Sequence, residues 1–172
     1  AAREKQSEAA RQLDVLLSEG VQLYEAGDLQ SARNSFLKVL TISESDATFK
    51  VLLSPTPYVG PDRGNKRDNH ANIGFKTEGD EMRRFLGAQP NLIIVNGDRH
   101  WQYRSIDPDT GLREFGSGPS SDVHAGGYSP QPGDDAVQKF FRLKGGFITV
   151  TVERVNSAPR MIVRHHDVAG AG

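Results

Sequence analysis

Two residues that could bind a metal follow the most apolar segment of the chain. Residues 91–95 (NLIIV) are predicted to form a buried strand that breaks at Asn96, after which Gly97 is expected to let the backbone turn sharply. Asp98 and His100 lie just beyond. A carboxylate oxygen and an imidazole nitrogen at this spacing can reach one divalent ion or two adjacent ions. A strand-ending turn with a capping aspartate and a surface histidine remains the other interpretation.

A second polar segment covers residues 61–72 (PDRGNKRDNHAN). Arg63 and Arg67 could clamp a phosphate, because the guanidinium fork matches phosphate oxygens. Asn69 and His70 could ligate a metal or protonate a leaving group. A solvated loop whose charges neutralise one another explains the composition equally well.

Two further segments carry histidine. Asp122 and His124 lie among glycines, which permit close approach of the backbone to a ligand, but a flexible surface turn is the favoured interpretation. In the run RHHD at 164–167, adjacent strand residues face opposite ways, so at most one of His165 and His166 would join a site. A solvated chain end is the expectation there.

The elements that must position these residues are short. A strand over 49–53, a helix over 78–86 and the strand over 91–95 imply a parallel sheet covered by helices. Trp101 and Tyr103 are expected to pack rather than to bind a ligand. An antiparallel part is expected after Trp101, with a turn at 107–111 and strands over 102–106, 112–115, 146–155 and 160–165.

The first 44 residues are predicted to form a helical hairpin. Apolar residues recur at helical spacing, and Gly27-Asp28 reads as a helix stop followed by a new N-cap. The segment resembles a single tetratricopeptide repeat, although any antiparallel helix pair fits equally well. One repeat does not bury its own apolar face. The positions that recur at helical spacing in the first helix are Leu13, Leu16, Leu17, Leu23 and Tyr24. Those expected to share one face of the second helix are Ala32, Phe36, Val39 and Leu40.

Composition excludes several classes of function. The 172 residues carry a net charge of -1, so no basic field suggests nucleic-acid binding. The absence of cysteine excludes disulfides, thiolate metal sites and a cysteine nucleophile. No apolar run approaches the roughly 20 residues of a membrane span, and no signal peptide is expected.

Several segments taken in order resemble the C-terminal part of PhoD-like phosphatases, the alkaline phosphatase D family with a calcineurin-like metallophosphatase fold. The resemblance runs from about Ser45 to the end of the chain and rests on SDATFKVLLSPTPYVGPDRGNKRDNHAN, NGDRHWQYRSIDPDTGL, GPSSDVHAGG, GGFITVTV and RHHDV. Together with the hairpin predicted at 1–44, it implies an α/β (α+β) chain with a partial metallophosphatase sheet at 45–172.

The resemblance also implies a function, hydrolysis of phosphate monoesters or diesters at a metal centre. Calcium and iron are the ions it suggests, with manganese or zinc as alternatives. It assigns ligand roles to Asp98 and His100, makes His70 a candidate acid, and places Arg63 and Asn69 at the substrate. Members of the PhoD-like family are often exported, but the sequence assigns no compartment to this chain.

The first 44 residues depart from this family. Its first metal ligands come from early strands with motifs such as GDxxY, and the predicted hairpin contains none of them. We therefore expect this chain alone to hydrolyse little or no phosphate ester. The alternative is a non-catalytic interaction module, in which the hairpin docks a peptide or protein partner and is fused to a degenerate phosphatase half.

Overall fold

The computed structural model describes residues 2–34, 47–61 and 69–168. The chain forms two compact units, Ala1–Ala47 and Thr48–Gly172, which are described separately. The boundary predicted after residue 44 falls within 35–46, outside the described residues. None of the helices in the described segments combines the length and the apolar character needed to cross a bilayer.

The N-terminal unit contains helix α1 (Ala2–Glu25) and a second helical segment that begins at residue 29. Gly27 adopts a left-handed φ of 79° after α1, and Asp28 accepts a hydrogen bond from the Ser31 amide at 3.1 Å. This bond is also the main cause that lowers the pKa of Asp28. The predicted stop and restart is therefore confirmed.

The predicted apolar positions of this unit differ in burial. Ala32, expected on the apolar face of the second helix, is buried, whereas Tyr24 of α1 is 63% exposed. Leu16 and Leu23 are half-buried. The remaining predicted positions, namely Phe36, Val39, Leu40 and the side chains of Leu13 and Leu17, lie outside the described residues.

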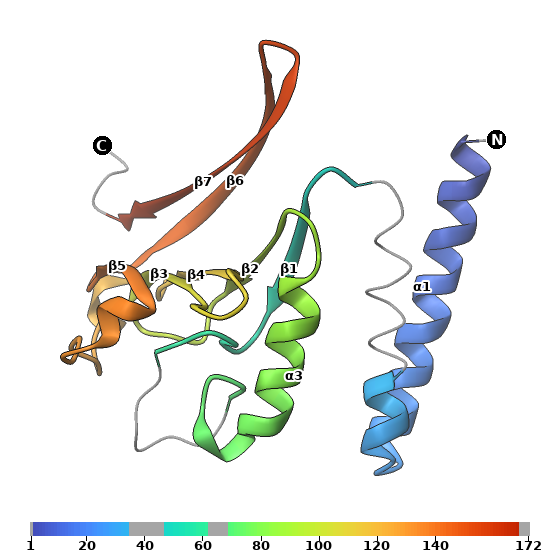
Figure 1. Ribbon diagram of the computed structural model, residues 1–172, viewed down its shortest axis with the longest axis horizontal. Coiled ribbons are helices and arrows are strands. Elements are labelled where there is room, and N and C mark those ends of the chain that lie inside the picture. Colours follow the sequence, from blue (N-terminus) through green and yellow to red (C-terminus); the bar gives the residue numbers. More distant parts are fainter. Residues whose placement is uncertain (1, 35–46, 62–68, 169–172) are drawn as a thin grey trace. The chain divides into compact units, whose positions relative to one another are not determined.

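A five-stranded mixed sheet organises the second unit, in the order β1-β2-β4-β3-β5 (Figure 1). The β1–β2 and β2–β4 pairs are parallel, whereas β3 pairs antiparallel with both β4 and β5. The predicted combination of a parallel sheet with an antiparallel part is thus confirmed, and the chain is α+β. The strands are β1 (Lys50–Ser54), β2 (Leu92–Asn96), β3 (Gln102–Ile106), β4 (Arg113–Ser117) and β5 (Gln138–Arg142).

Helix α3 (Lys76–Gly87) lies in the connection between β1 and β2, preceded by a single 3-10 turn, η1 (Ile73–Phe75). Leu86 is fully buried. Strand β2 supplies the centre of the core, because Ile93 and Ile94 are also fully buried. A central strand buried on both faces reads as a continuous apolar run, which is why the sequence identifies it.

The last two strands, β6 (Gly146–Val155) and β7 (Ala158–Asp167), form a separate antiparallel ribbon. The ribbon turns at Asn156 and Ser157, which both have positive φ, as a two-residue type I′ turn requires. Figure 1 shows the ribbon extending beyond the five-stranded sheet. Two further 3-10 turns, η2 (Asp122–His124) and η3 (Asp134–Ala136), lie between β4 and β5.

Candidate functional site

The predicted metal ligands lie at the carboxyl end of β2. Ser54 and Asn96 are partners in the parallel register, so β1 and β2 end side by side and the segments that follow leave from the same edge of the sheet. Ligands of open α/β sheets bind at such edges. Asp98 and His100 are both exposed there, and the His100 carbonyl oxygen accepts a hydrogen bond from a backbone amide.

Arg99, between the two predicted ligands, is the residue that sequence reasoning missed. Its side chain is 1% exposed, its Nη1 lies 3.4 Å from Asp98 Oδ2, and its guanidinium lies 5.7 Å from the centre of the Trp101 ring. Burial of Trp101 and Tyr103 confirms that these aromatic residues pack. No sequence pattern marks the burial of Arg99, because residues 98–101 lie outside the strands and Arg99 stands between two other polar residues.

Gly97 is predicted to allow a sharp turn of the backbone, but its conformation is one that other residues also adopt. Its φ is not in the left-handed region, and a Cβ added there would meet nothing closer than Ser117 Oγ at 3.7 Å. The turn after β2 therefore needs no glycine.

His70 and Asn69 come from the segment that follows β1. Asn69 is buried, and its Oδ1 accepts a hydrogen bond from the Ala71 amide at 3.0 Å, which forms an Asx turn. The Asn69 side chain, which the resemblance places at the substrate, thus forms a local turn. Arg63 and Arg67 lie outside the described residues.

The His70 imidazole is enclosed by an aromatic ring and a carboxylate. It stacks on Tyr58 with ring centres 4.8 Å apart and planes 7° apart. Its Nε2 lies 3.6 Å from Glu78 Oε1 in the first turn of α3, and its side chain is 25% exposed. Nδ1 is buried and has no hydrogen-bond partner among the described residues. Nε2 is therefore the nitrogen available for proton transfer.

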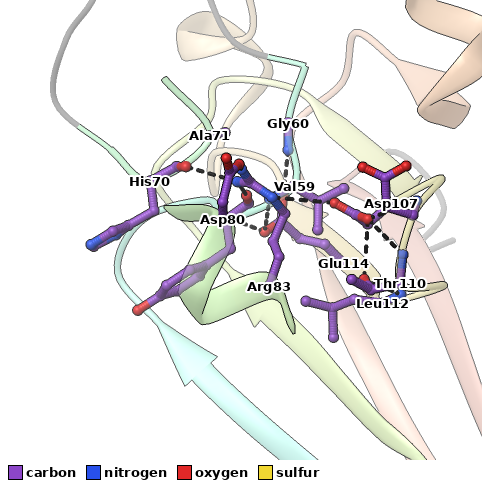
Figure 2. Close-up of polar contacts among 12 residues, drawn as sticks. Val59, Gly60, His70, Ala71, Asp80, Arg83, Asp107, Thr110, Leu112 and Glu114 are labelled. Atoms are coloured by element: carbon purple, nitrogen blue, oxygen red, sulfur yellow. Dashed lines mark hydrogen bonds and ion pairs between the residues drawn. The ribbon is translucent and has the colours of Figure 1, made fainter. Parts of the chain in front are cut away.

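Arg83 of α3 holds the main chain around His70 (Figure 2). Its Nη1 donates to the carbonyl oxygens of Tyr58 at 2.6 Å and His70 at 2.9 Å. Its Nε pairs with Asp107 Oδ2 at 3.2 Å, and its Nη2 pairs with Asp80. The guanidinium therefore joins helix α3 to the segment after β1 and to the turn after β3.

Glu114 of β4 is a buried carboxylate that serves the same segment. Its oxygens accept hydrogen bonds from the backbone amides of Tyr58, Val59 and Gly60 at 2.6, 3.1 and 3.3 Å, and from the Tyr103 hydroxyl at 2.8 Å. Burial nevertheless outweighs these bonds and raises the pKa of Glu114. No short-range sequence pattern marks Glu114 or Arg83, because their partners, apart from Asp80, lie 11 to 56 residues away.

Tyr103 extends this network to the end of β2. The Asn96 side-chain amide donates to the Tyr103 hydroxyl at 2.8 Å. Glu114 is consequently linked to both candidate segments, by main-chain amides to the segment after β1 and through Tyr103 to the last residue of β2.

The other histidine-bearing segments have structural contacts. Asp122 accepts from the Gly145 amide at 2.7 Å, the main cause that lowers its pKa, while His124 is exposed in η2. His165 Nε2 lies 3.1 Å from two main-chain carbonyl oxygens, and His166 stacks on Phe147. The two histidines face opposite sides of β7, as predicted, but both are half-buried rather than in a solvated chain end.

The described residues contain no group of three or more His, Asp or Glu side chains placed to hold a metal ion. Asp98, His100 and His70 are thus not assembled into one such group. No match to the chain was found among protein families, curated proteins or solved structures.

Proposed function

We propose that residues 45–172 are the C-terminal part of a metal-dependent phosphoric ester hydrolase of the PhoD-like type, to which Asp98 and His100 contribute metal ligands. The observation that carries this proposal is the shared edge of β1 and β2, whose partners Ser54 and Asn96 end the two strands side by side. The segments that resemble this family's site follow these two strands, at the edge where catalytic groups of α/β sheets collect.

The donors present fit such a centre only in part. Carboxylate oxygen and imidazole nitrogen suit calcium, iron, manganese or zinc. Asp98 and His100 supply two donors, and Asp98 also pairs with Arg99. Stable sites need more donors than this, and the described residues offer no third one in place. We derive no hydrolytic step for this chain and expect it to bind metal weakly.

Manganese titration of the full chain tests the ligand assignment. Bound Mn²⁺ loses its free-ion electron paramagnetic resonance signal, so the bound fraction can be measured directly. We expect the wild type to bind Mn²⁺, and His100→Ala and Asp98→Asn each to lose that binding, because each removes one of two donors. Hydrolysis of bis-p-nitrophenyl phosphate, assayed in parallel, should be at or near background.

His124→Ala is the matched control, because His124 is another exposed histidine beside an aspartate. It should bind Mn²⁺ as the wild type does. Equal and near-zero binding in wild type and His100→Ala would refute the ligand assignment, as would an equal loss in His124→Ala. Strong metal-dependent hydrolysis that His100→Ala abolishes would instead show that the site is complete.

A second candidate function is a protein-interaction module. Helix α1 exposes apolar side chains, with Val15 66% and Val21 49% exposed. Such residues on a helical hairpin suit a peptide or protein partner. The coding sequence upstream of Ala1 discriminates between the candidates. Further repeats of about 34 residues would support the module, whereas a strand ending in an aspartate motif would support the hydrolase.

A further inference from the structure

Tyr58 follows β1 and His70 precedes α3. Their rings stack with centres 4.8 Å apart, although the two residues are separated in the sequence. The contacts that bring these two residues together therefore decide where the His70 imidazole lies.

The guanidinium of Arg83 joins the main chain at Tyr58 to the main chain at His70. Arg83 Nη1 donates to both the Tyr58 and the His70 carbonyl oxygens, as Figure 2 shows for His70. Gly79 of α3 makes this approach feasible, because a Cβ added there would lie 2.1 Å from the His70 carbonyl oxygen. The contact between α3 and the His70 carbonyl oxygen thus depends on both Arg83 and Gly79.

The guanidinium is itself fixed from the other side. Asp107 at Nε and Asp80 at Nη2 determine its orientation, and the side chain is only 15% exposed. The donors of arginine have a rigid planar arrangement, so fixing Nε and Nη2 also fixes where Nη1 points. A lysine ammonium at the same position could not reach all four partners.

Glu114 holds the main chain at Tyr58 without the help of Arg83. Its carboxylate accepts the amides of three successive residues, Tyr58 to Gly60. Tyr58 is therefore held by its amide to β4 and by its carbonyl to α3. The main chain that carries the Tyr58 ring is consequently held from two elements.

We propose that Arg83 is a positioning residue for His70. It holds the His70 carbonyl beside that of Tyr58, so that the imidazole stacks with Nδ1 covered and Nε2 turned toward Glu78. Only the chemical purpose of this arrangement, proton transfer by His70, rests on the proposed function. The positioning itself is a property of the described contacts.

Nuclear magnetic resonance of the full chain tests the proposal. Stacking on Tyr58 shifts the His70 ring protons upfield, and a Tyr58→Leu variant gives their position without the ring. In Arg83→Lys we expect these signals to move toward the Tyr58→Leu position, because a lysine cannot bridge both carbonyls. Arg84→Lys, a neighbouring exposed arginine on α3, should leave them unchanged. An Arg83→Lys protein that is folded and retains the wild-type His70 shifts would overturn the proposal.

A second measurement needs no variant and covers the case in which Arg83→Lys does not fold. In the wild type, the Arg83 Nη protons should be resolved individually, with nuclear Overhauser contacts to the α protons of Tyr58 and His70. Averaged Nη signals without these contacts would overturn the proposal. Both measurements use metal-free protein, so their outcome is separate from the Mn²⁺ titration, which alone decides the ligand roles of Asp98 and His100.

Discussion

Glu114 carries a carboxylate into a part of the protein that water does not reach. Burial raises its pKa above the ordinary value of 4.5, although hydrogen bonds from Tyr58, Tyr103, Val59 and Gly60 act in the opposite direction. A raised pKa means that the folded state holds the proton more tightly than the unfolded chain does. The contribution of Glu114 to stability is therefore fully present below the unfolded pKa and is lost as the pH rises through the folded pKa.

Replacement of Glu114 by glutamine removes this titration. We expect the free energy of unfolding of the wild type, measured relative to Glu114→Gln, to fall as the pH rises from below 4.5 toward neutrality. Each unit by which the pKa is raised corresponds to about 1.4 kcal/mol of that fall. Lost hydrogen bonds in the variant add an offset that does not vary with pH. Urea unfolding of both proteins over a pH series measures the difference.

Glu153→Gln serves as the control for this experiment, because Glu153 is exposed on the ribbon. A Glu114→Gln difference that varies with pH no more than that of the control would contradict the raised pKa.

At the scale of elements, strands β3 and β4 pack through an aromatic ring laid over a glycine. Gly116 of β4 is opposite Tyr103 of β3 in the antiparallel register. A Cβ added at Gly116 would lie 2.0 Å from an atom of the Tyr103 ring. This absence of a side chain is what lets the Tyr103 hydroxyl reach Glu114 and the end of β2.

Alanine substitution at two glycines tests this packing. Gly116→Ala should destabilise the protein by about 1–3 kcal/mol, because the extra methyl group overpacks a buried contact. Gly97→Ala, one residue after β2, should change stability by no more than about 0.5 kcal/mol, since its Cβ would have room. Thermal or urea unfolding of the two variants measures both values. Equal effects would show that the Tyr103 ring is not confined by β4.

The same elements show what the sequence could and could not predict. Strand β2 is predicted to within one residue because its residues are apolar without interruption. The expected bounds of β3 and β6 match the structure, since turn residues follow β3 and mark both ends of β6. Strand β5 is not predicted: its sequence QKFFR has little apolar alternation, and its place depends on pairing with β3.

The residues of the candidate site also include some that the sequence predicts and some that it does not. The sequence indicates Asp98, His100 and His70 by residue type and spacing, and the structure places them after β2 and β1. The sequence does not indicate Arg83 or Glu114, because their roles depend on contacts with residues that are distant in the chain. A carboxylate in the middle of a strand has no local signature that distinguishes burial from exposure.

At the scale of the whole second unit, Gln102 joins the ribbon to the sheet. Its amide nitrogen donates to the Ser117 carbonyl at 3.0 Å and to the His166 carbonyl at 2.7 Å. Its amide oxygen accepts from Arg142 Nε at 2.8 Å. Gln102 is fully buried, so the loss of these bonds would leave polar groups without partners.

Gln102→Leu should therefore cost at least about 1–3 kcal/mol of stability, the penalty for an unsatisfied buried polar group. Val152→Thr offers a comparison on the ribbon itself. Val152 is 60% exposed, and its replacement should change stability by less than about 0.5 kcal/mol. Calorimetry of the two variants gives both values. A Gln102→Leu protein as stable as the wild type would show that the ribbon is held by other contacts.

The unequal anchoring of the ribbon has a consequence for hydrogen exchange. Near Gly146 and His166 the two strands are tied to the sheet through Gln102, whereas residues 151–160 are exposed. Amides close to the Asn156 turn can exchange through small openings that leave the sheet intact, and those close to Gly146 exchange only when the unit itself opens. One hairpin of ten paired positions thus spans a gradient of opening free energies, from nearly zero at the turn to the full stability of the unit at its base.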